Sequence, residues 1–230
     1  MTDRPELIVM LTWHDYTVKN AAQVFEQCKD SAAQYWGFKE HGLEPDKMRQ
    51  LYDRMHQCGK TTLMEVVAYT EAEGLAAAQL AAECRCDILM GTKYSDTILD
   101  YCHRHGLKYM PFVGTVTGRP SVLQGSIDDI VAEARELVGK GVDGIDLLAY
   151  RYTADAVALM HAVTHAVDAP VCMAGSIDST RRLDEVCQTG AWSFTIGSAF
   201  FEHRFGDTFC EQVNAVCRHV ATASGDTAKK

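Results

Sequence analysis

Short apolar runs alternate with amphipathic stretches along the whole chain. Each run is bounded by polar or glycine-containing segments, which is typical of strands buried in a parallel sheet. A helix-like pattern follows each run, so the sequence predicts a repeated strand–helix unit. The predicted strands cover residues 7–14, 34–39, 62–69, 87–92, 107–114, 144–150, 170–176 and 193–199.

The intervening helices carry recognisable signals. Met48, Leu51 and Met55 lie at helical spacing, so one face of that helix is apolar. Thr70 and Glu73 have the spacing of a capping box, which marks the beginning of another helix. Several of these stretches end at a glycine, as helices commonly do.

Strands that alternate with helices form right-handed crossovers and a parallel sheet. Eight such units in 230 residues predict a closed (β/α)8 TIM barrel, an α/β fold, in a single domain over residues 1–230. An open doubly wound sheet is the alternative if residues 34–39 do not form a strand. The polar residues 222–230 are expected to be a frayed tail.

Composition adds limits on partners and location. The formal net charge of −9 argues against nucleic acid and anionic membranes as partners. No apolar run approaches the ~18 residues of a membrane span, and residues 1–6 are too short and polar for targeting. The nine cysteines form no CxxC pair, which favours reduced thiols and a cytoplasmic location.

Two glycine–serine turns end the last two predicted strands. On the barrel interpretation these strands are neighbours, and the loops after strands 7 and 8 of such barrels often bind phosphate. Glycine permits close approach of a ligand and serine adds a hydroxyl. We therefore expect a phosphate cradle at Gly175, Ser176, Gly197 and Ser198. The alternative is that the small residues only allow the chain to turn into a helix.

The segment PVCMAGSIDSTRRLDEVCQTGAWSFTIGSAFF, which contains both turns, resembles the C-terminal quarter of the ribulose-phosphate-binding barrel superfamily. Locally it is most similar to N-acetylmannosamine-6-phosphate 2-epimerase, which has a comparable arrangement around strand 8. The resemblance implies a phosphorylated small-molecule substrate held at the two turns. It names no reaction, because the superfamily includes epimerases, isomerases, decarboxylases and synthases.

Catalytic groups in this fold lie at the C-terminal ends of the strands. Glu65 and Asp146 are carboxylates within apolar strands, where an isolated charge is costly, so both are expected to have cationic partners. Lys39 and Lys93 are the candidate partners, with Lys39 favoured, and His14 is a candidate acid, base or substrate-binding group. A structural salt bridge, a solvated lysine or a structural histidine is the alternative for each.

Residues 114–125 form the longest connecting loop and contain three glycines and a proline. We predict a lid, from which Arg119 reaches the substrate anion. An ordinary connector is the alternative. His14, His41, Glu65 and Asp146 could together approximate a metal site, but they lack the short motifs of the metal-dependent 3-epimerases, so no cofactor is expected and a metal ion is the less favoured option.

These features predict an isomerase or epimerase of carbohydrate metabolism that moves a proton next to a carbonyl in a phosphorylated sugar or sugar acid. The alternatives are an aldolase or lyase that forms a Schiff base with Lys39 or Lys93, and a non-catalytic barrel that binds a phosphorylated metabolite. The expected partner is the small phosphorylated substrate. Barrels of this size often associate through their outer helices, so a homo-oligomer is a further expectation.

Overall fold

The computed structural model describes residues 4–223, and within them eight parallel strands form the wall of a barrel. The strands follow the order β10-β11-β12-β1-β4-β5-β6-β7. A bridge between Phe112 and Asp146 joins the two ends, and the Asp146 N–H donates to the Pro111 carbonyl at 3.0 Å. The predicted (β/α)8 fold is therefore confirmed. The barrel strands are β1 (Glu6–Met10), β4 (Tyr35–Lys39), β5 (Thr61–Val66), β6 (Ile88–Gly91), β7 (Lys108–Met110), β10 (Ile145–Leu147), β11 (Val171–Met173) and β12 (Ser193–Ile196).

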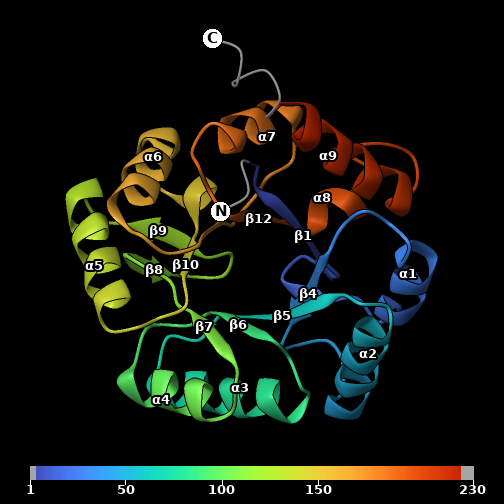
Figure 1. Ribbon diagram of the computed structural model, residues 1–230, viewed down its shortest axis with the longest axis horizontal. Coiled ribbons are helices and arrows are strands. Elements are labelled where there is room, and N and C mark those ends of the chain that lie inside the picture. Colours follow the sequence, from blue (N-terminus) through green and yellow to red (C-terminus); the bar gives the residue numbers. More distant parts are fainter. Residues whose placement is uncertain (1–3, 224–230) are drawn as a thin grey trace.

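Helices surround the strands as a ring (Figure 1). The capping box predicted at Thr70 and Glu73 begins α3, with both reciprocal hydrogen bonds present. Met48, Leu51 and Met55 are buried on the inner face of α2, as their spacing predicts. The helices are α1 (Ala21–Cys28), α2 (Pro45–Gln57), α3 (Glu71–Glu83), α4 (Asp96–Arg104), α5 (Ile127–Gly139), α6 (Ala156–Ala166), α7 (Thr180–Cys187), α8 (Ser198–Phe201) and α9 (Phe209–Ala223), with a 3-10 turn η1 at Ala149–Arg151.

Side chains alternate between the two sides of each strand, so the core has two layers. Leu7 and Val9 of β1 pack outward against the helices. Ile8 and Met10 point into the barrel, where they form a separate apolar cluster with Leu63 and other interior residues. The barrel is therefore a filled core rather than a channel, and ligands can enter only at its ends.

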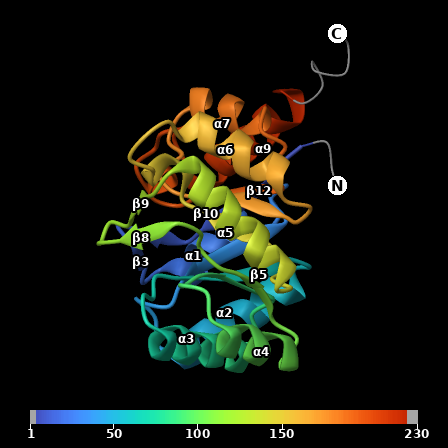
Figure 2. The same ribbon diagram turned by 90° about the vertical axis from the view of Figure 1, so that its left-hand side faces the viewer.

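Two hairpins extend beyond the barrel strands at the same end of the molecule (Figure 2). One consists of β2 (Thr12–Trp13) and β3 (Tyr16–Thr17), where the sequence predicts the end of the first strand. The other consists of β8 (Thr115–Thr117) and β9 (Val122–Gln124), within the predicted loop. β-branched residues on both sides of a Gly118–Pro120 turn favour this pairing over an irregular loop.

The described residues also limit two other predictions. Residues 222 and 223, at the start of the predicted frayed tail, belong to α9, while residues 224–230 lie outside the described part. No helix within residues 4–223 is both long and apolar enough to cross a membrane.

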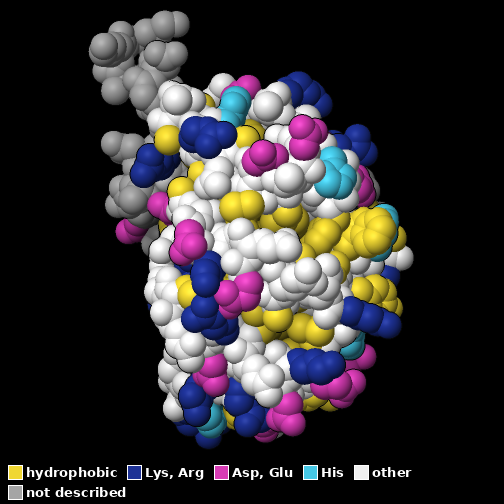
Figure 3. All heavy atoms as spheres, turned by 90° about the vertical axis from the view of Figure 1, so that its right-hand side faces the viewer, with side chains coloured by type: hydrophobic (Ala, Val, Ile, Leu, Met, Phe, Trp, Pro, Cys, Tyr) yellow, Lys and Arg dark blue, Asp and Glu magenta, His cyan; other side chains and the backbone are white. Residues whose placement is uncertain are grey.

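Hydrophobic side chains form a band across the face shown in Figure 3. Among the described residues, most large hydrophobic side chains are buried, but Trp13 and Tyr16 of the first hairpin and Val122 of the second are 47%, 59% and 38% exposed. Apolar surface of this kind is often covered by another protein chain. The expected homo-oligomer stays a prediction, and the face shown in Figure 3 is where we would look for the contact between its subunits.

Candidate active site

Strand alternation brings Lys39 and Glu65 together inside the barrel at its C-terminal end. The two residues are register partners on β4 and β5, and Lys39 Nζ lies 3.6 Å from Glu65 Oε1. Gly37 precedes Lys39 by two residues and faces the same side. A Cβ on Gly37 would lie 2.6 Å from the Leu63 carbonyl oxygen, so glycine is what allows the two strands to pack at this point.

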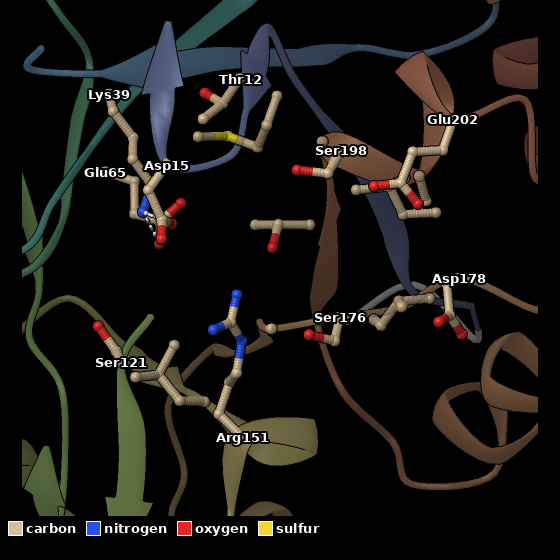
Figure 4. A pocket seen from close by; sticks show the side chains of 18 residues that line it. Thr12, Asp15, Lys39, Glu65, Ser121, Arg151, Ser176, Asp178, Ser198 and Glu202 are labelled. Carbon is tan, nitrogen blue, oxygen red and sulfur yellow. Dashed lines mark hydrogen bonds and ion pairs between the residues drawn. The ribbon is translucent and has the colours of Figure 1, made fainter. Parts of the chain in front are cut away.

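These side chains line a cavity of about 190 Å³ at the barrel mouth. Figure 4 shows Lys39, Asp15 and Glu65 on one side of it, with Ser176 and Ser198 on the other. The lining residues come from the ends of β1, β4, β5, β11 and β12, from both hairpins, and from η1 and α8. Segments far apart in the sequence therefore share one pocket.

Asp15 belongs to this group because of the first hairpin. His14 and Asp15 both have positive φ values (47° and 66°), as in the tight turns that join two antiparallel strands. Thr17 fastens the hairpin to β4, since its Oγ1 accepts from the Lys39 N–H at 3.0 Å and donates to the Lys39 carbonyl at 2.7 Å. Lys39 Nζ then donates to Asp15 Oδ1 at 2.8 Å.

His14, the predicted catalytic residue of this segment, lies elsewhere. Strand β1 ends at Met10, and the turn exposes the His14 side chain at the hairpin tip. Only its backbone reaches the site, where the N–H donates to Ser198 Oγ at 3.1 Å. The prediction of His14 treated the segment as one straight strand, whereas the turn places the side chain of Asp15, and not that of His14, in the pocket.

The charges of this group stabilise one another. Burial opposes the charge of Lys39, but the nearby Glu65 carboxylate and the hydrogen bond to Asp15 outweigh it and raise the pKa of Lys39 above its ordinary value. Burial likewise opposes the charge of Asp15, but Lys39, and secondarily Arg151 and Arg119, lower the pKa of Asp15. Both groups are therefore charged at neutral pH.

Asp146 lies in the barrel wall near this group. It is fully buried on β10, and neither of its carboxyl oxygens has a hydrogen-bond partner within the described residues. Burial, followed by repulsion from Glu65, raises the pKa of Asp146 well above its ordinary value, against an opposing effect of Lys39. Asp146 therefore favours its neutral form, whereas the sequence predicted a charged carboxylate with a cationic partner.

The two glycine–serine turns are neighbours, as predicted. β11 pairs with β12, and Gly175, Ser176, Gly197 and Ser198 all line the pocket. A Cβ on Gly175 would lie 2.6 Å from Arg151 Cγ, and one on Gly197 would lie 2.9 Å from the Thr12 carbonyl oxygen. Both glycines therefore leave space for other parts of the protein. Arg151 occupies the space beside Gly175 and itself lines the pocket.

Arg151 is the cation beside the two turns. It ends η1, its guanidinium projects into the pocket (Figure 4), and its Nε is buried without a hydrogen-bond partner among the described residues. Ser198 Oγ accepts the His14 N–H, which leaves the hydroxyl proton of Ser198 free to donate. Arg151 and Ser198 thus supply donors suited to an anion.

Two carboxylates at the same rim are paired with arginines. Arg182 Nη1 lies 3.0 Å from Asp178 Oδ1 and also donates to the Ser176 carbonyl, so it orders that turn. Arg204 Nε lies 3.2 Å from Glu202 Oε2. These ion pairs offset the negative charge of Asp178 and Glu202 near the predicted cradle.

Two further predicted residues lie outside the pocket. Lys93 is exposed after β6 and lines a separate cavity of about 490 Å³ beside the β8–β9 hairpin. Arg119 is exposed in the turn of that hairpin, where its Nη2 donates to the Val67 carbonyl at 2.8 Å. Arg119 therefore ties the hairpin to the end of β5, and it acts on Asp15 only through its charge, which lowers the pKa of Asp15.

Among the lining residues that sequence reasoning did not propose for the site are Asp15, Ser121 and Arg151. Asp15 and Arg151 follow predicted strands directly, and this position was the available signal. Ser121 had none, because it reaches the pocket only through the hairpin. Among residues 4–223, no group of three or more His, Cys, Asp or Glu side chains is arranged to hold a metal ion.

Comparison with known proteins yields fold neighbours only. No protein-family model and no curated protein matches the chain. A structure described as native KDPGal has a TM-score of 0.70 at 13% identity, covering 95% of this chain and 96% of that chain. Orotidine 5'-phosphate decarboxylase from Pyrococcus horikoshii OT3 has a TM-score of 0.70 at 11% identity, covering 94% and 99%. The TrpA-G66V mutant of tryptophan synthase from M. tuberculosis has a TM-score of 0.69 at 13% identity, covering 95% and 94%.

At these identities the comparisons establish the barrel fold. The local similarity to N-acetylmannosamine-6-phosphate 2-epimerase stays a resemblance, since no sequence comparison extends it.

Proposed function

We propose that this chain is an enzyme that binds a small phosphorylated substrate and moves a proton next to its carbonyl group, as an isomerase or epimerase. One observation carries the proposal. A single pocket has anion-binding donors on one wall and the Asp15–Lys39–Glu65 group on the other. The fold likeness to orotidine 5'-phosphate decarboxylase, an enzyme named for a phosphorylated substrate, is consistent with it.

The phosphate would lie against Arg151, Ser176 and Ser198. The guanidinium and the free Ser198 proton donate to phosphate oxygens, and charge-assisted bonds of this kind are strong. Binding energy from the phosphate then positions the rest of the substrate against the opposite wall.

Proton transfer would take place at that opposite wall. The Glu65 carboxylate accepts the proton from the carbon beside the carbonyl. The electron pair of the C–H bond forms the carbon–carbon double bond of an enolate, and the π electron pair of the C=O bond moves to the oxygen. Lys39, charged and held by Asp15, donates a hydrogen bond to the developing enolate oxygen. Return of the proton to the former carbonyl carbon, with the proton of the adjacent hydroxyl group moving to the former carbonyl oxygen, gives an isomer. Return of a proton to the other face of the original carbon gives an epimer.

The Schiff-base alternative is less well supported by this geometry. A lysine attacks a carbonyl as a neutral amine, whereas Asp15 and Glu65 raise the pKa of Lys39 against the effect of burial. Lys93 lies outside the pocket. We expect borohydride treatment with a bound keto substrate to leave the protein mass unchanged, and a covalent adduct on Lys39 would favour the aldolase or lyase.

The first test is thermal stabilisation by a panel of sugar phosphates, each paired with its unphosphorylated parent. We expect phosphorylated members to stabilise the protein selectively, and equal stabilisation by the parents would contradict the phosphate assignment. Members that bind are then incubated in deuterium oxide with the protein.

Carbon-bound deuterium in the recovered substrate, or its isomer, would show the proton transfer directly. Glu65→Gln and Lys39→Met should abolish the exchange, while Lys93→Met, a lysine outside the pocket, should retain it. Selective phosphate binding without exchange or turnover for any bound member would favour the non-catalytic barrel.

A further inference from the structure

The hydroxyl groups of Tyr69 and Ser121 meet at the wall of the pocket. Tyr69 Oη lies 2.8 Å from the Gly118 carbonyl oxygen and 3.1 Å from Ser121 Oγ. A carbonyl oxygen only accepts, so the single hydroxyl proton of Tyr69 goes to Gly118. Ser121 must therefore be the donor in its contact with Tyr69.

The assignment of these two hydroxyl protons decides which hydrogen bonds Ser121 can form with a ligand. Its only hydroxyl proton is engaged by Tyr69, so Ser121 has lone pairs alone for the pocket that it lines. The residue is 9% exposed, so a ligand bound there would largely exclude water from it. A ligand group that cannot donate would leave these lone pairs unsatisfied, which costs affinity.

Arg151 and Ser198 have the reverse polarity. Arg151 has donors only, and the hydroxyl proton of Ser198 is free because its oxygen already accepts from the His14 backbone. In Figure 4, Ser121 lies across the pocket from Ser176 and Ser198. The pocket thus accepts hydrogen bonds at Ser121 and donates them at Ser198 across from it, with the Arg151 guanidinium projecting between the two sides (Figure 4).

We infer that Ser121 is a specificity residue that accepts a hydrogen bond from a hydroxyl group of the substrate. The pocket would therefore take a phosphate ester with a hydroxylated carbon chain in preference to its deoxy analogue. This inference rests on the proposed phosphate site and adds the chemistry of the opposite end of the ligand.

Isothermal titration calorimetry with three probes tests it: glycerol 1-phosphate, propyl phosphate and 2,3-difluoropropyl phosphate. Only the first can donate from its carbon chain. A net hydrogen bond of about 0.5–1.5 kcal/mol predicts that the wild-type protein binds glycerol 1-phosphate roughly 2- to 12-fold more tightly than either analogue. Ser121→Ala should abolish this preference, and propyl phosphate should bind to this variant at least as tightly as to the wild-type protein, because no lone pairs are then left unsatisfied. Thr117→Ala, on the same hairpin but lining the other cavity, should retain the preference.

Other results separate the two proposals. If the wild-type protein binds all three probes equally and Arg151→Met weakens all three, the phosphate site stands and the role of Ser121 is wrong. A preference that survives in Ser121→Ala also overturns the inference. If no probe binds, and inorganic phosphate does not bind either, the proposed function and this inference both fail.

Discussion

Lys39→Met replaces a buried ammonium group with an uncharged chain of similar length and leaves Asp15 and Glu65 without their common cation. The Lys39 and Glu65 side chains are 9% and 11% exposed, whereas that of Asp15 is 30% exposed. Breaking a buried pair costs about 3–5 kcal/mol. Because Asp15 can be partly rehydrated, we take the lower limit and expect a loss of about 3 kcal/mol in the free energy of unfolding at pH 7. For a chain of this size, that corresponds to a fall in Tm of about 6–12 °C.

The dependence on pH identifies the cause. In the wild-type protein the pKa of Asp15 is lowered, so its contribution to stability is present above the unfolded pKa and is lost as the pH falls through the folded pKa. Without Lys39, burial remains as the main effect and favours protonation of Asp15. The stability difference between the wild-type and Lys39→Met proteins should therefore shrink between pH 7 and about pH 4.

Urea unfolding followed by circular dichroism at several pH values measures this difference, and Lys93→Met provides the control. Lys93 is exposed and outside the pocket, so its replacement should change stability by less than about 0.5 kcal/mol. A Lys39→Met loss no larger than that of Lys93→Met would refute the ion-pair cluster. A large loss that is the same from pH 4 to pH 8 would show that packing, and not charge, causes it.

Three further predictions concern the same site. Asp146→Asn should increase the free energy of unfolding near pH 7 and make it depend less on pH above about pH 4. The reason is that the raised pKa of Asp146 makes the folded wild-type protein less stable as the pH rises above the pKa of this group in the unfolded chain. Urea unfolding at several pH values measures this, and an unchanged dependence of stability on pH would contradict it. Arg151→Met should weaken binding of propyl phosphate about 10- to 100-fold by calorimetry, the equivalent of about 1.5–3 kcal/mol, and an unchanged Kd would remove Arg151 from the phosphate site. Gly175→Ala should lose about 1–2 kcal/mol of stability from its positive φ of 84° and, since its Cβ would displace Arg151, should also lose phosphate affinity. Gly190→Ala has a similar φ of 77° with open space around the Cβ, so it should show the stability loss alone, and equal phosphate affinity in the two variants would count against the displacement.

Strand periodicity explains why part of the site was predictable. Lys39 lies two residues after Gly37, and Glu65 two residues after Leu63. Side chains two residues apart on a strand face the same side, so the sequence alone places Lys39 and Glu65 on the inner side of the barrel. The two glycine–serine turns were predictable for the same reason, because consecutive strands of such a barrel are neighbours and end at the same rim. These features depend on local geometry repeated along the chain.

The roles of Asp15 and Arg119 depended on loop geometry. A tight turn directs Asp15 into the pocket and His14 out of it, and the Thr17 contacts with β4 decide where that turn lies. Arg119 could have reached the anion by length and charge, but the hairpin places it against the Val67 carbonyl. Neither direction follows from a pattern of apolar and polar residues.

The sequence by itself determined the barrel, the order of its strands and the strand-borne half of the site, because alternation along a strand and helical periodicity are local properties. Only the tertiary structure decided that Arg151 enters the space left by Gly175, that Lys93 lies outside the pocket, and that Ser121 gives its proton to Tyr69. The physical reason is that a loop side chain takes the direction set by contacts with residues far along the chain. The same contacts engage some of its hydrogen-bond donors and acceptors, and only the remaining ones can bind a ligand.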